Sequence, residues 1–181
     1  LKVMAHAHGA RGIEAASRAG IDTIEHGTFA DEAALKVMKA NGTAMVPTLM
    51  AFQGVSEGLG KGIYTPVVEE KIRMTLNTVG KAVASAKRLG VPIVFGTDAG
   101  VFDHGRNAEE LQLMVDAGLT RREALASATT LAAKALDMDN EIGRIAVGYS
   151  ADLIAFDGNP LDDVRVLEKI DWVMVRGRII D

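Results

Sequence analysis

Three apolar runs in this sequence each lead to side chains that can bind a metal. His6 and His8 lie in the first run, His26 ends the second, and Asp98 follows the run at 91–94. Neutral imidazole nitrogens and carboxylate oxygens hold zinc and similar divalent ions, and a catalytic site keeps one position open for water. Any one His could instead cap a strand by bonding a buried backbone group. Recurrence of the pattern favours a divalent-metal site, with zinc as the expected ion.

Strand patterns and helix patterns alternate along the first 139 residues. Apolar runs bounded by Gly predict strands, and Ala-rich segments with apolar residues at helical spacing predict helices. The expected strands cover 3–9, 21–27, 43–48 and 92–95, and the expected helices cover 10–19, 31–40 and 67–89. Each strand is apolar on both faces, which is typical of a parallel sheet. The Gly-rich stretch 48–66, with Tyr64, is a candidate active-site lid.

Two further helices are predicted from their first residues. Asn107 and Thr120 stand where capping residues belong, and each is followed three residues later by a Glu, at Glu110 and Glu123. This spacing predicts a capping box at both helix starts.

The pattern changes after residue 140. Short runs at 143–148, 151–156 and 172–180 are typical of antiparallel strands. We therefore expect a domain division into a larger portion, 1–139, and a β-strand segment of a small second lobe, 140–181.

Composition narrows the class of protein. The chain has 181 residues, 48% of them hydrophobic, and a net charge of −4, which favours a globular protein without nucleic-acid partners. It has no cysteine, so a metal must be held by His and carboxylate groups, and a cytoplasmic location is the default expectation. No apolar run reaches about 18 residues, so no membrane span is predicted. The first residue already lies inside a strand pattern, and we expect an N-terminal portion to be missing.

Four motifs in this order resemble the metal-dependent amidohydrolase superfamily, in particular its prolidase-like and imidazolonepropionase-like branch. They are Ala5-His6-Ala7-His8-Gly9, Ile24-Glu25-His26-Gly27, Gly96-Thr97-Asp98-Ala99-Gly100, and the closing block 142–153 completed by Asn159-Pro160-Leu161. The resemblance covers essentially the whole chain and implies an α/β fold. That fold would be the C-terminal half of a TIM-like (β/α)₈ barrel, strands 5–8, followed by short β-strands of a composite β-sandwich lobe.

The resemblance also implies which of these side chains bind the metal. His6, His26 and Asp98 match the ligands at the ends of the fifth, sixth and eighth barrel strands. A first-strand His-x-His motif and a lysine that bridges two metals have no counterpart here and would lie upstream. The alternative that His6-Ala7-His8 is itself the first-strand motif is disfavoured, because Asp98 would then fall on the fourth strand.

The activity implied is hydrolysis of a carbon–nitrogen bond in a small-molecule amide or dipeptide, including Xaa-Pro-like substrates. Metal-activated hydroxide would attack the amide carbonyl, and Asp98 would be both a metal ligand and the catalytic proton shuttle. Gly9 suggests that the first strand ends near His6, which leaves His8 to the substrate pocket. Further substrate-binding candidates are Tyr64, His104 and Arg106, the last able to pair with a substrate carboxylate or simply to be solvated.

Two other readings stay open at this point. One is a mononuclear deaminase or cyclic-amide hydrolase of the same superfamily. The other is a catalytically silent half-barrel that needs a partner chain or forms a homo-oligomer, because an open parallel sheet edge invites association. The 181 residues alone are expected to be inactive, since the upstream ligands are absent.

Overall fold

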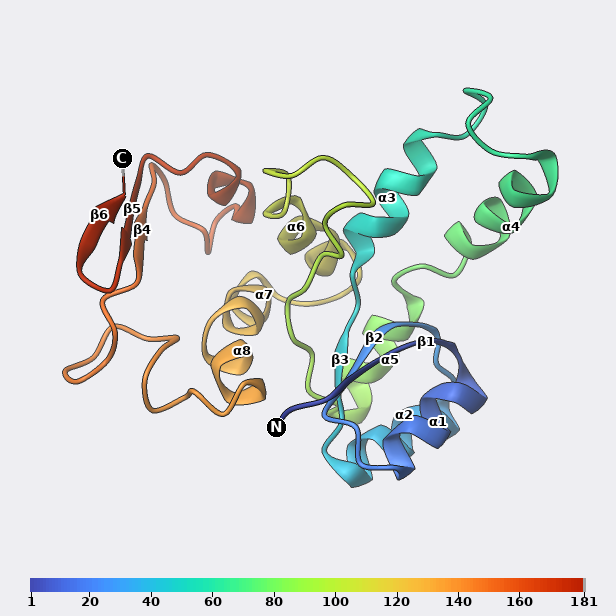
Figure 1. Ribbon diagram of the computed structural model, residues 1–181, viewed down its shortest axis with the longest axis horizontal. Helices are drawn as coiled ribbons and strands as arrows, with labels where there is room; N and C mark the ends of the chain where they lie inside the picture. Colours follow the sequence, from blue (N-terminus) through green and yellow to red (C-terminus); the bar gives the residue numbers. More distant parts are fainter. Residues whose placement is uncertain (181) are drawn as a thin grey trace.

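Three parallel strands form the sheet that carries the predicted metal ligands (Figure 1). They are β1 (Met4–Gly9), β2 (Thr23–Phe29) and β3 (Ala44–Val46), in the order β1-β2-β3. The expected strand at 92–95 is reduced to one parallel bridge between Ile93 and Met45. The amide of Val94 donates to the carbonyl of Met45 in β3, and the amide of Phe95, on the other side of the segment, donates to the carbonyl of Ser127. The α/β class and the parallel sheet are confirmed.

Two helices follow the first two strands, as predicted. Helix α1 (Ala10–Arg18) and helix α2 (Glu32–Asn41) lie side by side at one end of the molecule (Figure 1). Asp31 caps α2 by accepting from the amide of Ala34, and Gly42 ends it with a left-handed φ of 72°. Large apolar side chains from both helices and the sheet are fully buried together, namely Ile13, Ile24, Leu35, Met38 and Met45.

The region between β3 and the bridge at Ile93 differs from its prediction. Helix α3 (Leu49–Glu57) occupies the first part of the stretch 48–66, which the sequence predicts to be weakly patterned. The single helix expected at 67–89 is two helices, α4 (Pro66–Leu76) and α5 (Lys81–Leu89). Gly80 has a φ of 82°, which no helix continues through, and so divides them. No residue of α4 is buried, and Figure 1 shows α4 projecting from the body of the molecule.

Three helices follow the Asp98 segment. They are α6 (Glu109–Asp116), α7 (Arg121–Ala128) and α8 (Thr130–Ala135). The capping box between Thr120 and Glu123 is confirmed at the start of α7. The capping box expected between Asn107 and Glu110 is wrong, because α6 has no side-chain cap. The side-chain amide of Asn107 donates instead to the hydroxyl of Thr97.

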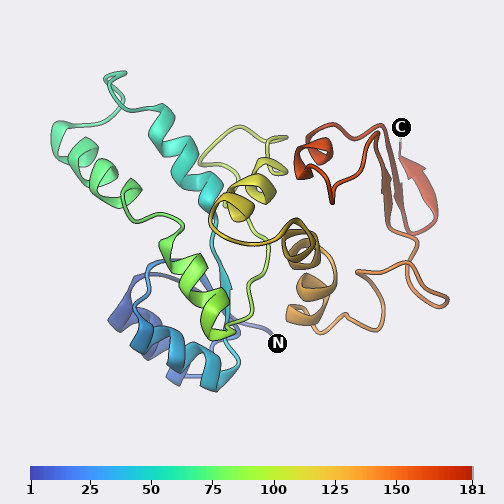
Figure 2. The same ribbon diagram turned by 180° about the vertical axis from the view of Figure 1, so that it is seen from behind.

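A second, antiparallel sheet lies at the opposite end from α1 and α2 (Figure 2). It consists of β4 (Leu153–Ala155), β5 (Trp172–Val175) and β6 (Arg178–Ile180), with the 3₁₀ helix η1 (Val164–Glu168) between the first two. The strand expected at 143–148 is absent from the described residues, because Ile145 and Val147 are 90% and 104% exposed and pair with no other strand.

The structure, a computed structural model, describes residues 1–180. Within that range, none of the helices has the length and apolar character needed to cross a membrane. The division into portions 1–139 and 140–181 stays a prediction.

Candidate metal centre

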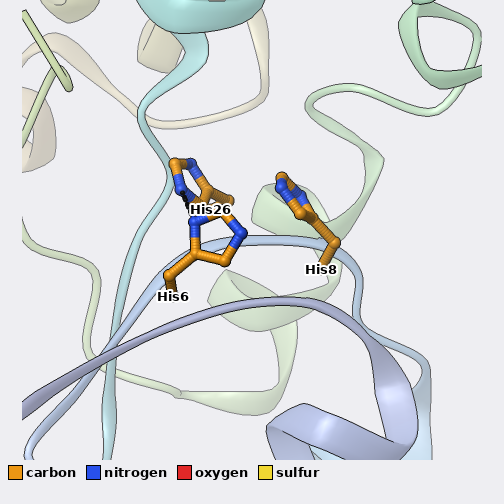
Figure 3. Close-up of side chains that lie close together, drawn as sticks. All are labelled: His6, His8 and His26. Carbon is orange, nitrogen blue, oxygen red and sulfur yellow. Dashed lines mark hydrogen bonds between the residues drawn. The ribbon is translucent and has the colours of Figure 1, made fainter.

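Three histidines converge near the C-terminal ends of β1 and β2 (Figure 3). His6, His8 and His26 each offer one ring nitrogen, and the three nitrogens lie within 4.8 Å of one another. The expectation that the first strand ends near His6 is wrong, because β1 runs to Gly9. Residues two apart on a strand share a face. His8 therefore projects to the same side as His6 and joins the cluster.

Hydrogen bonds fix the orientation of these rings. His26 Nε2 lies 2.8 Å from His6 Nδ1, and the opposite nitrogen, His26 Nδ1, lies 2.6 Å from the hydroxyl of Thr48. His8 Nδ1 lies 2.9 Å from the hydroxyl of Thr28. A hydrogen-bond partner on one ring nitrogen fixes the orientation of the ring and so directs the other nitrogen. Two threonines that the sequence did not single out thus orient two of the three imidazoles.

Burial keeps two of these imidazoles neutral. The pKa of His26 is lowered to about 4, first by burial and then by the neighbouring His8 and His6, while the Asp98 carboxylate acts in the opposite direction. The pKa of His8 is also lowered, by burial and then by His6. A neutral imidazole is the form that binds a metal. At neutral pH these two side chains are therefore ready to act as ligands.

Asp98 lines the same pocket as the three histidines. This pocket, with a volume of about 170 Å³, is closed on one side by α3 through Ala51, Phe52 and Val55. Left-handed backbone angles occur around it, at His26 (φ 72°), Thr48 (φ 48°) and Asp98 (φ 56°). Such angles are strained for residues other than Gly and concentrate at functional sites. Of the predicted site residues, the structure thus brings together His6, His8, His26 and Asp98.

The other predicted site residues lie elsewhere. Tyr64 and Arg106 line a neighbouring pocket of about 260 Å³ beside the C-terminal end of α3. The Arg106 guanidinium donates to both carboxylate oxygens of Glu57, at 3.0 and 2.9 Å, and also to Glu109. His104 is exposed. Roles for these three side chains toward a substrate stay predictions.

Glu110 is a buried acid, and the capping-box role predicted for it from the sequence is wrong. Its side chain is fully buried, and its two carboxylate oxygens accept from the amides of Leu49 and Met50, at 2.9 and 2.6 Å. Burial raises its pKa to about 8, although the two amide donors oppose the shift. The only feature of the sequence that could have indicated this burial is the position of Glu110 directly before Leu111, at the start of the apolar pattern that continues to Met114.

The donors present fit a divalent metal. The cluster supplies neutral imidazole nitrogens, and Asp98 supplies a carboxylate at the edge of the same pocket. Two nitrogens bound to a tetrahedral zinc at 2.0–2.1 Å lie about 3.4 Å apart. The 2.8 Å between His6 Nδ1 and His26 Nε2 is close to this separation, so a small ring movement suffices.

The sequence model of the amidohydrolase family matches residues 1–180 of this chain. The chain belongs to the amidohydrolase family. The resemblance predicted from the four motifs is therefore confirmed, and so is an α/β fold shared with structural neighbours of this family.

This amidohydrolase chain is similar to several known proteins. A solved structure of a Xaa-Pro dipeptidase with bound methionine in its active site superposes with a TM-score of 0.94 at 40% identity, covering 100% of this chain and 45% of that one. Ochratoxinase from Aspergillus niger is 35% identical over 172 residues, covering 92% of this chain and 35% of the relative. An uncharacterized protein from Mycobacterium tuberculosis is 34% identical over 183 residues, covering 98% and 47%. The chain spans about half or less of the length of these relatives.

Proposed function

We propose that this chain supplies metal-binding and proton-transferring side chains to a zinc-dependent site that hydrolyses the amide bond of Xaa-Pro-like dipeptides. The observation that carries the proposal is the pocket shared by three imidazoles and Asp98. The likeness to a Xaa-Pro dipeptidase supports the substrate class. Neutral imidazole and carboxylate ligands support zinc as the ion.

The proposal includes the architecture expected from the sequence. Strands β1, β2 and β3 and the bridge at Ile93 would be strands 5–8 of a (β/α)₈ barrel, and β4–β6 would be part of a composite β-sandwich lobe. Ligands at the C-terminal ends of parallel strands agree with the position of active sites in such barrels.

His6, His26 and Asp98 would hold the metal. When bound, zinc lowers the pKa of water from about 15.7 to near 7 and polarises the substrate carbonyl. Asp98 accepts the proton released by the attacking water and delivers it to the amide nitrogen that leaves, which in an Xaa-Pro dipeptide is the proline nitrogen. The two products are an amino acid and proline.

His8 would act on the substrate. Its Nδ1 is engaged by Thr28, which leaves Nε2 available to donate to a substrate carbonyl or carboxylate oxygen. Thr48 holds the His26 ring by Nδ1 and so directs Nε2 toward His6 and the metal position.

A specific observation favours a second candidate, in which these residues are catalytically silent without a partner chain. Apolar side chains are exposed around a second pocket of about 290 Å³ between the sheet and α8, among them Met4 at 71% and Leu136 at 57%. An exposed apolar surface of this kind is typical of a site that another polypeptide segment covers. The hydrolytic site would then be completed by side chains from another polypeptide.

The test measures zinc content and dipeptide hydrolysis in the same preparation. The chain is loaded with zinc, its metal content is determined by elemental mass spectrometry, and release of proline from Ala-Pro is compared with hydrolysis of Ala-Ala. Asp98→Asn should lower kcat by at least about 100-fold, the usual range for a general acid–base group. Asp157→Asn, at an exposed position outside both of these pockets, is the matched control.

Three outcomes separate the candidates. Zinc together with proline release supports the hydrolase. Stoichiometric zinc without hydrolysis supports the silent chain that needs a partner. Absence of zinc binding at micromolar concentrations overturns the metal centre itself.

A further inference from the structure

We infer that Glu110 is a positioning residue for the metal centre, which it serves by capping α3 and so holding Thr48 against His26. The inference rests on the function proposed above. It concerns a side chain that touches neither substrate nor metal, and it follows from three linked contacts.

The first contact is the cap itself. The first amides of a helix have no partner within the helix, and a buried helix start needs an acceptor from elsewhere. Thr48 precedes α3 but makes no side-chain cap. The Glu110 carboxylate takes this place by accepting from the amides of Leu49 and Met50. The two bonds give a partner to the first two amides of α3, which would otherwise be buried without an acceptor.

The second contact joins Thr48 to the histidine cluster. Its hydroxyl lies 2.6 Å from His26 Nδ1. Thr48 also has a left-handed φ of 48°, a strained conformation that persists only when its surroundings enforce it. The adjacent residue, Leu49, is bonded to Glu110, so the carboxylate fixes the backbone next to the strained position.

The third contact extends the effect along α3. Phe52, one turn further on, meets the rings of His8 and His26 edge-on at centroid distances of 6.0 and 6.3 Å. A shift of the N-terminal end of α3 would thus move Thr48 and Phe52 together. Glu110 is the buried group that opposes such a shift.

The far end of α3 is held separately, which provides a matched control. Glu57 near that end is paired with Arg106, and Arg106 also binds Glu109, the residue beside Glu110. Glu109→Gln therefore changes the same chemical group at the adjacent position of α6. It leaves the cap on Leu49 and Met50 in place.

The experiment compares Glu110→Gln with Glu109→Gln in the full chain. Zinc affinity is measured by competition with a chelator, and the His26 ring nitrogens are followed by ¹⁵N NMR without metal. Gln presents an NH₂ group to one of the two amides and breaks that bond. We expect Glu110→Gln to weaken zinc binding by about 10–100-fold, the range for groups that orient a ligand. We also expect it to change the His26 ¹⁵N shifts, with both readouts unchanged in Glu109→Gln.

A double-mutant cycle separates positioning from a general loss of stability. If Glu110 acts through Thr48, then Thr48→Ala in the Glu110→Gln background adds little to the loss already present. Additive losses would overturn the inference. So would wild-type zinc affinity and wild-type His26 shifts in a folded Glu110→Gln variant.

Two further points keep the test decisive. If thermal unfolding shows that Glu110→Gln does not fold, Glu110→Asp, which keeps the carboxyl group with less reach, should give the same changes at smaller size. Wild-type behaviour of that variant would count against the inference. If the wild-type chain binds no zinc, the proposed function fails, but the His26 shifts in the metal-free chain still test the Glu110 link.

Discussion

The histidine-bearing strands and the start of α3 meet at one pocket but are positioned in different ways. His6 and His26 stand on β1 and β2, whose parallel ladder pairs His6 with Glu25 and Ala7 with His26. Thr48 stands at the start of a helix whose first amides depend on one carboxylate from a position 60 or more residues away. The strand positions are therefore fixed by several backbone hydrogen bonds along the ladder, whereas the first two amides of α3 share one buried acceptor, Glu110.

The largest expected effect comes from weakening the strand side. Ile24 is fully buried in β2, two residues before His26. Ile24→Ala should lower the free energy of unfolding by about 2–5 kcal/mol, because it leaves a cavity in the core. Ile154→Ala, at a 51% exposed position of β4, should cost well under half of that. Urea unfolding of both variants measures the two losses of unfolding free energy. Equal losses would contradict the view that the buried part of β2 stabilises the site.

Removal of a ligand tests the strand side without disturbing the ladder. His26→Ala should weaken zinc binding by more than about 100-fold, since even groups that merely orient ligands contribute 10–100-fold. His104→Ala removes an exposed imidazole outside the cluster and should leave zinc affinity unchanged. Chelator competition measures both. Equal affinity in the two variants would exclude His26 as a ligand.

The pH dependence of stability should reveal the contribution of Glu110 at the start of α3. The pKa of Glu110 is raised to about 8 in the folded protein, from 4.5 when exposed. The folded state therefore holds this proton more tightly, so its stabilising contribution is complete below pH 4.5 and is lost as pH rises through 8. Between pH 7 and 9 we expect the unfolding free energy to fall by about 1 kcal/mol.

Urea titrations at several pH values make that measurement. The fall above pH 7 should be absent in Glu110→Gln, which cannot ionise. A fall of the same size in that variant would assign it to other groups.

The smallest effect is expected at the far end of α3. The pair between Arg106 and Glu57 is partly exposed, with side-chain exposures of 33% and 42%. Glu57→Gln should cost less than about 1 kcal/mol of stability, as is usual for such ion pairs. It should also leave zinc affinity unchanged, as measured by the same urea and chelator assays. A zinc-affinity loss comparable to that of Glu110→Gln would mean that both ends of α3 position the centre.

Two of the wrong predictions lie on the helix side. The sequence predicts a local capping box between Asn107 and Glu110, yet Glu110 caps α3 instead. The stretch after β3 is predicted to be weakly patterned because it is rich in Gly. It is helical because its amides find an acceptor on α6 and its apolar residues Leu49 and Met50 are buried. No local pattern records either cause.

The sequence by itself determined the parallel strands, the family, and the order in which His6, His26 and Asp98 follow the strand runs. These features depend on periodicity and on motifs of a few consecutive residues, which are local. Only the tertiary structure decided that Thr28, Thr48 and Glu110 support the site. Their hydrogen bonds join residues 20 to 61 positions apart, and such pairings exist only after the sheet and the helices have packed.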